Sequence, residues 1–284
     1  MPILKISNEL SGVISTFSNK ISNELQDNID ILVKNNDSFS LIYKNANSIL
    51  LKNNYVLIKN IGFNKDKSLF EAFIKLFGSF YGESIEYADI RIECNYTACD
   101  YNLIELHNDD MIALEKMPNY GFIQVLKEDP LKLAKNGLVK ILEVVNYLKY
   151  HDAELLEDLM SVKVPMMTYG INYNDANKEW TSLNETILYY SGKNDIHVRF
   201  DLGTIDTYYW QNKLEQPRKE KKMISDFLDT CKKFRKEFYI EQGDILIHNN
   251  KTTLHDRTQT AIELNLDGSF NSREIFVGFT KDYE

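Results

Sequence analysis

The sequence predicts an α+β fold in which an antiparallel barrel or jelly roll is decorated with helices. Short segments rich in Val, Ile, Phe and Tyr alternate with turns through much of the chain. Helical periodicity lies mainly before and between these segments, not in regular βαβ alternation, and neither GxGxxG nor GxxxxGK[ST] occurs. No Gly/Pro-rich linker divides the chain, so we expect a single domain over residues 1–284.

The N-terminal part is predicted to be helical and then to enter the sheet. Apolar residues at helical spacing over 5–35 predict one or two amphipathic helices, interrupted by the polar stretch 35–38. A β-rich run follows at 55–62. Asp66 or Ser68, the latter in a capping box with Glu71, would then begin a helix that continues to Phe77 and ends at Gly78.

The remaining elements are predicted from short β-rich runs and from charged amphipathic segments. Helices are expected over 153–159 and 218–234, where Ile224, Phe227 and Leu228 share one face. Further strands are expected at 90–94, 121–126, 196–200, 238–240, 245–248 and 274–279.

Composition excludes several classes of function. The 284 residues carry 33 basic and 42 acidic side chains, a net charge of −9, which argues against nucleic acid or an anionic membrane as partner. No apolar run has the length of a membrane helix, and residues 1–17 lack a signal-peptide core, so we expect a cytoplasmic protein. Cys94, Cys99 and Cys231 are too few for a disulfide scaffold and lack zinc-site spacing, which favours free thiols.

Among the five histidines, His107 stands next but one to an acid, Asp109. In an extended segment these two side chains project to the same side and could reach one metal ion, although a loop histidine beside an acid is the plain alternative. We expect His151 to be exposed and His197 to be structural, from its place in an alternating strand.

A second group of residues lies near the C-terminus. A Gly243-Asp244 turn leads into an apolar strand, then to a loop and a strand that presents His255, and Arg273 follows 18 positions later. Two histidines and one carboxylate form the facial triad of non-heme Fe(II) oxygenases.

These segments together resemble the Fe(II)/2-oxoglutarate-dependent oxygenases of the taurine dioxygenase and clavaminate synthase-like family. His107 and Asp109 match the family's His-x-Asp motif. Arg273 and Gly278 match its Arg-x-x-x-x-Gly strand, and the resemblance extends over about residues 50–280. The family's Gly-Asp-x-x-x-x-Asp-Asn-x-x-x-x-His-Gly-Arg motif is matched by Gly243, Asp244, Asn249, Asn250, His255, Asp256 and Arg257.

The resemblance implies a double-stranded β-helix, or jelly-roll, core with N-terminal helices and a helical insertion or lid at about 140–235. It implies that His107, Asp109 and His255 hold Fe(II), with 2-oxoglutarate and O2 as co-substrates. The implied reaction is hydroxylation of a C–H bond in a small metabolite, with release of succinate and carbon dioxide. The expected partner is therefore a small-molecule substrate, and the sequence predicts no oligomeric state.

Two arginines are candidates for the carboxylates of 2-oxoglutarate. Arg273 carries a full positive charge in an apolar strand. Its planar guanidinium group suits two-point contact with a carboxylate, and the resemblance assigns to it the binding of the far carboxylate of 2-oxoglutarate. Pairing with Glu274 or Asp244 is the alternative. Arg257 is a second candidate for carboxylate contact, with structural pairing as its alternative.

The sequence departs from the family at several positions. Asn249 and Asp256 replace the usual Asp and Gly. In the Gly-rich turn matched by 136–137, Val139 replaces a hydroxyl that in many relatives helps to hold 2-oxoglutarate. Either another hydroxyl, such as that of Thr253, substitutes for it, or binding of the co-substrate is weak. His248 stands where relatives usually have an aromatic residue, and we expect it to pack beside the site while His255 is the ligand.

Acidic residues near the first two ligands, Glu105, Asp110 and Glu115, favour a substrate with an amino group, such as a free or modified amino acid. Two other readings stay open. One is a non-catalytic relative that binds a metal and a small acid, suggested by Val139, Asn249 and Asp256. The other is a β-barrel metalloenzyme that does not use 2-oxoglutarate, and replacement of Arg273 would distinguish it.

Overall fold

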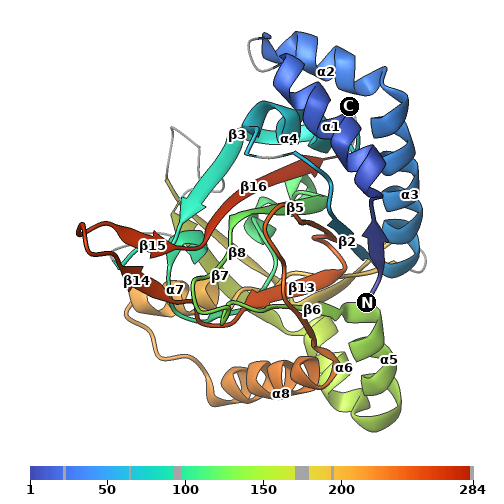
Figure 1. The fold of residues 1–284 in the computed structure, drawn as a ribbon. Coiled ribbons are helices and arrows are strands. Elements are labelled where there is room, and N and C mark those ends of the chain that lie inside the picture. The colour runs from blue at the N-terminus through green and yellow to red at the C-terminus, as the bar shows by residue number, and fades with distance from the viewer. Residues whose placement is uncertain (22–23, 64, 93–96, 170–178, 193–194, 282–284) are drawn as a thin grey trace.

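Two facing β-sheets form the centre of the computed structural model, which describes residues 1–21, 24–63, 65–92, 97–169, 179–192 and 195–281 (Figure 1). Neighbouring strands are antiparallel except β1 and β2, which are parallel. The larger sheet has the order β1 (Ile3–Lys5), β2 (Tyr55–Lys59), β12 (Ile245–Asn249), β5 (Tyr120–Lys127), β16 (Glu274–Lys281) and β3 (Ser79–Asp89). The smaller has the order β11 (Lys236–Phe238), β6 (Asn136–Lys140), β13 (Thr253–Arg257) and β4 (Ile104–His107).

The alternation of side chains along β12 explains how the sheets are layered. Ile245 and Ile247 belong to the core beneath the N-terminal helices, whereas Leu246 belongs to the core between the two sheets. His248 follows Leu246 at i+2 and therefore faces the smaller sheet as well. This arrangement places the imidazole that follows the apolar residues 245–247 between the sheets.

Four helices cover the outer face of the larger sheet: α1 (Asn8–Ile21), α2 (Gln26–Lys34), α3 (Asp37–Asn53) and α4 (Lys67–Ile74). One or two amphipathic helices are predicted within 5–35, and the structure has two, α1 and α2, but α3 was not predicted. The polar stretch 35–38 not only ends α2 but also begins α3, because the Asn36 side chain accepts hydrogen bonds from the backbone N–H groups of Ser38 and Phe39.

The prediction for the next helix and strand needs correction. Asp66, and not Ser68, caps α4 by accepting from the Leu69 N–H, and the helix ends at Ile74 instead of Phe77. The strand predicted at 90–94 is wrong where the structure describes it, because β3 already ends at Asp89 and residues 93–96 lie outside the described residues. The polar sequence of β3 is a weak strand signal, and its pairing with β16 stabilises it.

The segment 140–235 packs its own apolar core against the smaller sheet, with Val139 and Leu254 contributed by that sheet. Its predicted helices are confirmed, and the strand predicted at 196–200 ends at Val198. The helices at 141–151 and 202–211 were not predicted. Its elements are α5 (Ile141–His151), α6 (Ala153–Ser161), β7 (Lys163–Tyr169), β8 (Trp180–Thr186), β9 (Leu188–Ser191), β10 (Asp195–Val198), α7 (Leu202–Gln211) and α8 (Arg218–Phe234).

The other predicted strands agree with β2, β5, β12 and β16, while β11 shares only Phe238 with the predicted 238–240. The smaller elements are the 3-10 turns at Thr97–Cys99 and Met111–Lys116 and the hairpin of β14 (Ile262–Leu264) and β15 (Phe270–Ser272). Cys231 is a buried free thiol as expected, but Cys99 is disulfide-bonded, contrary to the expectation of free thiols. Within the described residues no helix combines the length and the apolar character needed to cross a membrane.

Candidate metal centre and adjoining pocket

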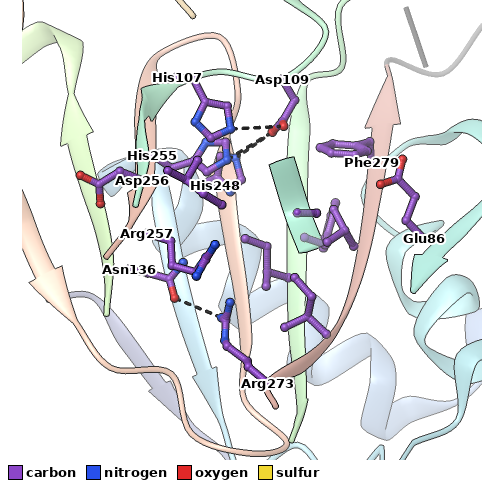
Figure 2. A pocket seen from close by; sticks show the side chains of 16 residues that line it. Glu86, His107, Asp109, Asn136, His248, His255, Asp256, Arg257, Arg273 and Phe279 are labelled. Carbon is purple, nitrogen blue, oxygen red and sulfur yellow. Dashed lines mark hydrogen bonds and ion pairs between the residues drawn. The ribbon is translucent and has the colours of Figure 1, made fainter. Parts of the chain in front are cut away.

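A pocket lies between the two sheets and is lined by residues of β3, β5, β12 and β16 on one side and of β4, β6 and β13 on the other. Figure 2 shows three imidazoles and a carboxylate at one end of it, and two guanidinium groups at the other. Between the ends the wall is apolar and includes Phe122, Ile123 and Phe279.

The structure brings His107, Asp109 and His255 together at the first end of the pocket. His107 ends β4 and faces His255 of β13 in register. The candidate ligand atoms of the three residues all lie within 4.8 Å of one another. The Nε2 atom of His107 is 3.8 Å from Asp109 Oδ1, and that of His255 is 3.5 Å from Asp109 Oδ2. Two imidazoles and one carboxylate around a common point form a donor set suited to Fe(II).

Each histidine presents one ring nitrogen to the converging site. The Nδ1 atom of His107 lies 2.8 Å from the Glu105 carbonyl oxygen and donates to it, which leaves Nε2 as the ring nitrogen that faces Asp109. Burial, together with the nearby His107 and His248, holds the pKa of His255 well below its usual value. A neutral imidazole is the form that binds a metal ion.

Two asparagines hold the backbone that carries Asp109. The fully buried Asn250 accepts from the Asp109 N–H at 2.9 Å and donates to the Asp109 carbonyl oxygen at 2.8 Å. Asn108 donates to the carbonyl oxygens of Val198 and Asn250 and accepts from the Phe200 N–H. Asn250 matches the Asn of the C-terminal motif, and the structure gives that position a structural role: it fixes the segment that carries Asp109 and does not line the pocket.

The electrostatics of this end favour a bound cation. Burial raises the pKa of Asp109, His107 opposes that change, and Asp201 adds to it. The neighbouring Asp110 has a pKa raised to about 8, by burial and then by the charge of Asp109. Burial and mutual repulsion make it unfavourable for both carboxylates to be deprotonated. A bound divalent cation would offset both effects.

The opposite end of the pocket holds Arg273 and Arg257. Arg273 is 4% exposed, and among the described residues its only hydrogen bond is to Asn136 Oδ1, at 3.2 Å. The alternative partners are engaged elsewhere, because Glu274 pairs with Lys65 and Lys127, and Asp244 pairs with Lys59. Arg273 therefore has no protein carboxylate as partner in the described part of the chain.

Arg257 is held differently. Its guanidinium donates to the backbone carbonyl oxygens of Asp100 and Asn102, while its Nε has no partner among the described residues. Burial lowers the pKa of Arg273 to about 10, and burial with the charge of Arg273 lowers that of Arg257 to about 9. Two buried, mutually repelling cations at one end of a pocket make a site for an anion such as a carboxylate.

Thr253 and Val139 lie away from this pocket. The Thr253 hydroxyl donates to the Asn249 carbonyl oxygen at 2.7 Å, and Val139 is buried in the core of the segment 140–235. Residues 136–137 begin strand β6 and do not form a turn. The side chain that this strand contributes to the pocket is Asn136, which the sequence did not single out.

Asp256, at the position where the family usually has glycine, is explained by Arg235. The Arg235 guanidinium binds both carboxylate oxygens of Asp256, with Nε to Oδ2 at 2.5 Å and Nη2 to Oδ1 at 2.8 Å. Gly137 lies opposite Asp256 in the sheet, and a Cβ there would overlap both side chains of the pair. The lack of a side chain at Gly137 therefore leaves the space that the Arg235–Asp256 pair occupies.

His248 lies directly beside the candidate metal centre. It is 1% exposed, lines the pocket, and its ring centroid is 4.5 Å from that of His255. Burial and then the charge of His107 lower its pKa to about 3, so the imidazole is neutral. Within the described residues neither ring nitrogen has a hydrogen-bond partner.

Of the acids near the ligands, neither Glu105 nor Asp110 lines this pocket; Asp110 lines a separate one beside Asp201. The side chain of Glu115 lies outside the described residues. The acid that the structure does bring to the pocket is Glu86 of β3, beside Phe279 on the wall facing the metal end (Figure 2). Sequence reasoning missed Glu86 because β3 itself was not predicted.

Residues 18–267 match the family described as taurine catabolism dioxygenase TauD, TfdA. Among solved structures, an asparagine oxygenase in complex with Fe(II), 2S,3S-3-hydroxyasparagine and succinate is similar, with a TM-score of 0.75 and 10% identity over 100% of this chain and 94% of that chain.

The non-heme iron oxygenase OrfP in complex with Fe and α-ketoglutaric acid has a TM-score of 0.71 and 11% identity, over 99% of this chain and 94% of that chain. OrfP in complex with Fe, succinate and (3S)-hydroxy-L-Arg gives the same values. At these identities the likeness shows the fold. No curated protein sequence matches the chain.

Proposed function

The chain belongs to the taurine catabolism dioxygenase TauD, TfdA family, and from this we propose that it is an Fe(II)- and 2-oxoglutarate-dependent dioxygenase that hydroxylates a free or modified amino acid. One observation carries the proposal. A single pocket holds two histidines and a carboxylate that converge at one end and, at the other, a buried arginine without a carboxylate partner among the described residues.

Each end of the pocket has a chemical task in this proposal. His107, Asp109 and His255 would hold Fe(II), and when bound with O2 the iron and 2-oxoglutarate supply the oxidising power to hydroxylate a C–H bond. Arg273 would bind the far carboxylate of 2-oxoglutarate, and Arg257 would add to the positive potential there. The apolar wall between the ends excludes water, which protects the reaction from side processes.

We also propose the finer architecture and the domain organisation. The two facing sheets would be the halves of a double-stranded β-helix, with the metal site between them. Residues 1–284 would form one oxygenase domain, and the segment 140–235, packed on the outer face of the smaller sheet, would be its insertion. Since Asp109 would supply a carboxylate ligand, we expect hydroxylation or desaturation and not halogenation.

The substrate class follows from the acid in the pocket and from the similar structures. Glu86 offers a carboxylate that can accept hydrogen bonds from an amino group. The similar structures hold hydroxylated asparagine and hydroxylated arginine. A small amino acid with its amino group toward Glu86 would therefore suit the pocket.

Turnover tests this proposal. The Fe(II)-loaded protein is supplied with 2-oxoglutarate and, one at a time, each proteinogenic amino acid, and succinate and oxygenated product are measured by mass spectrometry. We expect one amino acid class to stimulate succinate formation and to gain one oxygen atom. Glu86→Gln should raise KM for that substrate more than it lowers kcat, because Glu86 contacts the substrate away from the metal.

Other outcomes would contradict specific parts of the proposal. Stimulation by sulfonates alone would exclude the amino acid class while keeping the reaction. Metal binding with no 2-oxoglutarate consumption under any condition would favour a non-catalytic binding protein.

A further inference from the structure

We propose that His248 is a positioning residue for the candidate metal centre, donating a hydrogen bond from Nε2 to the Asp109 carboxylate. This inference rests on the proposed function, since Asp109 must be a metal ligand for it to matter. His248 is not one of the three candidate metal ligands, and the proposal gives it a function in addition to packing.

The surroundings of His248 call for a polar partner. An imidazole that is 1% exposed, with both nitrogens unpartnered among the described residues, carries the desolvation cost of a buried polar group. Its Nε2 is 3.9 Å from Asp109 Oδ2, the same oxygen that faces His255. A movement of about 1 Å by either side chain would bring this pair to hydrogen-bond distance.

The chemistry of the two groups fixes the direction of the bond. A carboxylate only accepts hydrogen bonds, and a neutral imidazole has one N–H and one lone pair, so the proton of His248 belongs on Nε2. His255 faces the same oxygen but needs its Nε2 lone pair for the metal. Of the two imidazoles beside Oδ2, His248 is the one that can donate to it.

The neighbouring strand is built to admit this ring. His248 pairs in register with Gly121 of β5, and a Cβ at position 121 would overlap the ring carbon of His248 and lie 2.7 Å from Nε2. The glycine thus leaves space that the imidazole fills. Hydrogen-bonding partners of metal ligands fix the orientation of those ligands and tune metal affinity, and their loss costs roughly 10- to 100-fold.

The test is a titration with Mn(II), a redox-stable substitute for Fe(II), in which the free ion is measured by electron paramagnetic resonance. His248→Phe keeps an aromatic ring without a donor and should weaken Mn(II) binding roughly 10- to 100-fold. His248→Gln keeps an N–H donor and should recover most of that loss. His151→Phe, at an exposed helix end remote from the pocket, should bind as the wild type does.

A double-mutant cycle separates positioning from general damage to the fold. Gly121→Ala should weaken Mn(II) binding in the wild type, because the methyl group displaces the imidazole, but should have little effect in His248→Ala. If His248→Phe binds Mn(II) as tightly as the wild type, while His255→Ala does not bind, this inference is wrong and the metal centre stands. If the wild type itself binds no Mn(II), both this inference and the candidate metal centre are wrong.

The visible spectrum of the Co(II)-substituted protein supplies a readout that does not depend on affinity. We expect His248→Phe to shift the bands only slightly, because the ligand set is unchanged. A change of intensity typical of a different coordination number would show that His248 is itself a ligand and would overturn the positioning role.

Discussion

At the scale of single residues, Asn250 is as important to the candidate metal centre as the groups that face it. Its side chain holds both backbone groups of Asp109, and it also donates to the Pro118 carbonyl oxygen. Asn250 is fully buried, Pro118 is buried and Asp109 is half-buried, so removing the amide would leave polar groups unsatisfied away from bulk water.

We therefore predict that Asn250→Ala lowers the free energy of unfolding by about 2–4 kcal/mol and weakens metal binding as well. Urea denaturation measures the first effect. Asn28→Ala, on the exposed face of α2, is the matched control and should cost less than about 0.5 kcal/mol. An Asn250→Ala protein as stable as this control would show that the contacts to Asp109 contribute little.

The residues that the sequence could nominate are those whose chemistry shows in their spacing. His107, Asp109, His255 and Arg273 stand at motif distances, and the structure places all four around one pocket. Thr253 is the sequence-based candidate for the missing hydroxyl, but its hydroxyl donates to the Asn249 carbonyl oxygen. Asn136 reaches the pocket only through the pairing of β6 with β13, which no local pattern reports.

At the scale of elements, the pair of Arg235 and Asp256 joins the end of α8 to strand β13, next to His255. The side chain of Asp256 is 7% exposed and that of Arg235 is 18% exposed. Breaking such a pair from one side leaves a nearly buried charge without its partner.

We predict that Arg235→Ala lowers the free energy of unfolding by about 2–4 kcal/mol, a little less than for a fully buried pair because Arg235 keeps some exposure. The double variant Arg235→Ala/Asp256→Gly should recover much of this loss, since it removes the unpaired carboxylate. Thermal or urea unfolding of the wild type and the two variants checks this. A double variant less stable than Arg235→Ala would contradict it.

Helix caps give a second prediction at this scale. Asp66 caps α4 and also accepts a hydrogen bond from the Ser18 hydroxyl of α1, at 2.9 Å. Asp66→Ala should cost about 1–2 kcal/mol, and Ser68→Ala much less, because Ser68 does not cap the helix. Equal losses for the two variants, measured by urea denaturation, would favour the capping box instead.

Elements were predictable where a local signal was strong. Helix α8 was predicted with its observed bounds, because its apolar residues repeat at helical spacing and its other faces are highly charged. Helix α3 was missed because the same polar residues that end α2 also cap the next helix. Strand β3 was missed because Gly82 and its acidic residues are poor strand formers, and only pairing with β16 determines its conformation.

At the scale of the whole molecule, metal binding should be visible as stability. The metal would join β4 to β13, and the unfolded chain offers no assembled site. We predict that Mn(II) at 100 times its Kd raises the free energy of unfolding by about 2.7 kcal/mol, and that a chelator reverses this. Thermal scans with and without metal measure it. His255→Ala should show no such shift, and a shift that persists in that variant would place the metal elsewhere.

The predicted α+β class is confirmed at this scale. The order in which the strands pair within each sheet could not be predicted from the sequence. Strands β5 and β12 begin at Tyr120 and Ile245, 125 residues apart, yet they pair directly, and such non-local register depends on tertiary packing. The motifs could be found without the order because each is carried by one strand, or by two strands that follow each other in the chain, with the adjoining turns.

The most direct measurement is an anaerobic titration with Fe(II) and then 2-oxoglutarate, followed by the visible absorption band that a 2-oxo acid gives on binding Fe(II). We expect the band in the wild type and in Arg91→Ala, which removes an exposed arginine. It should vanish in His107→Ala and His255→Ala, which lose the metal, and in Arg273→Leu, which keeps the metal but loses the anion. Metal binding without a band in the wild type, or a band that survives in Arg273→Leu, would contradict the assignment of this pocket to 2-oxoglutarate.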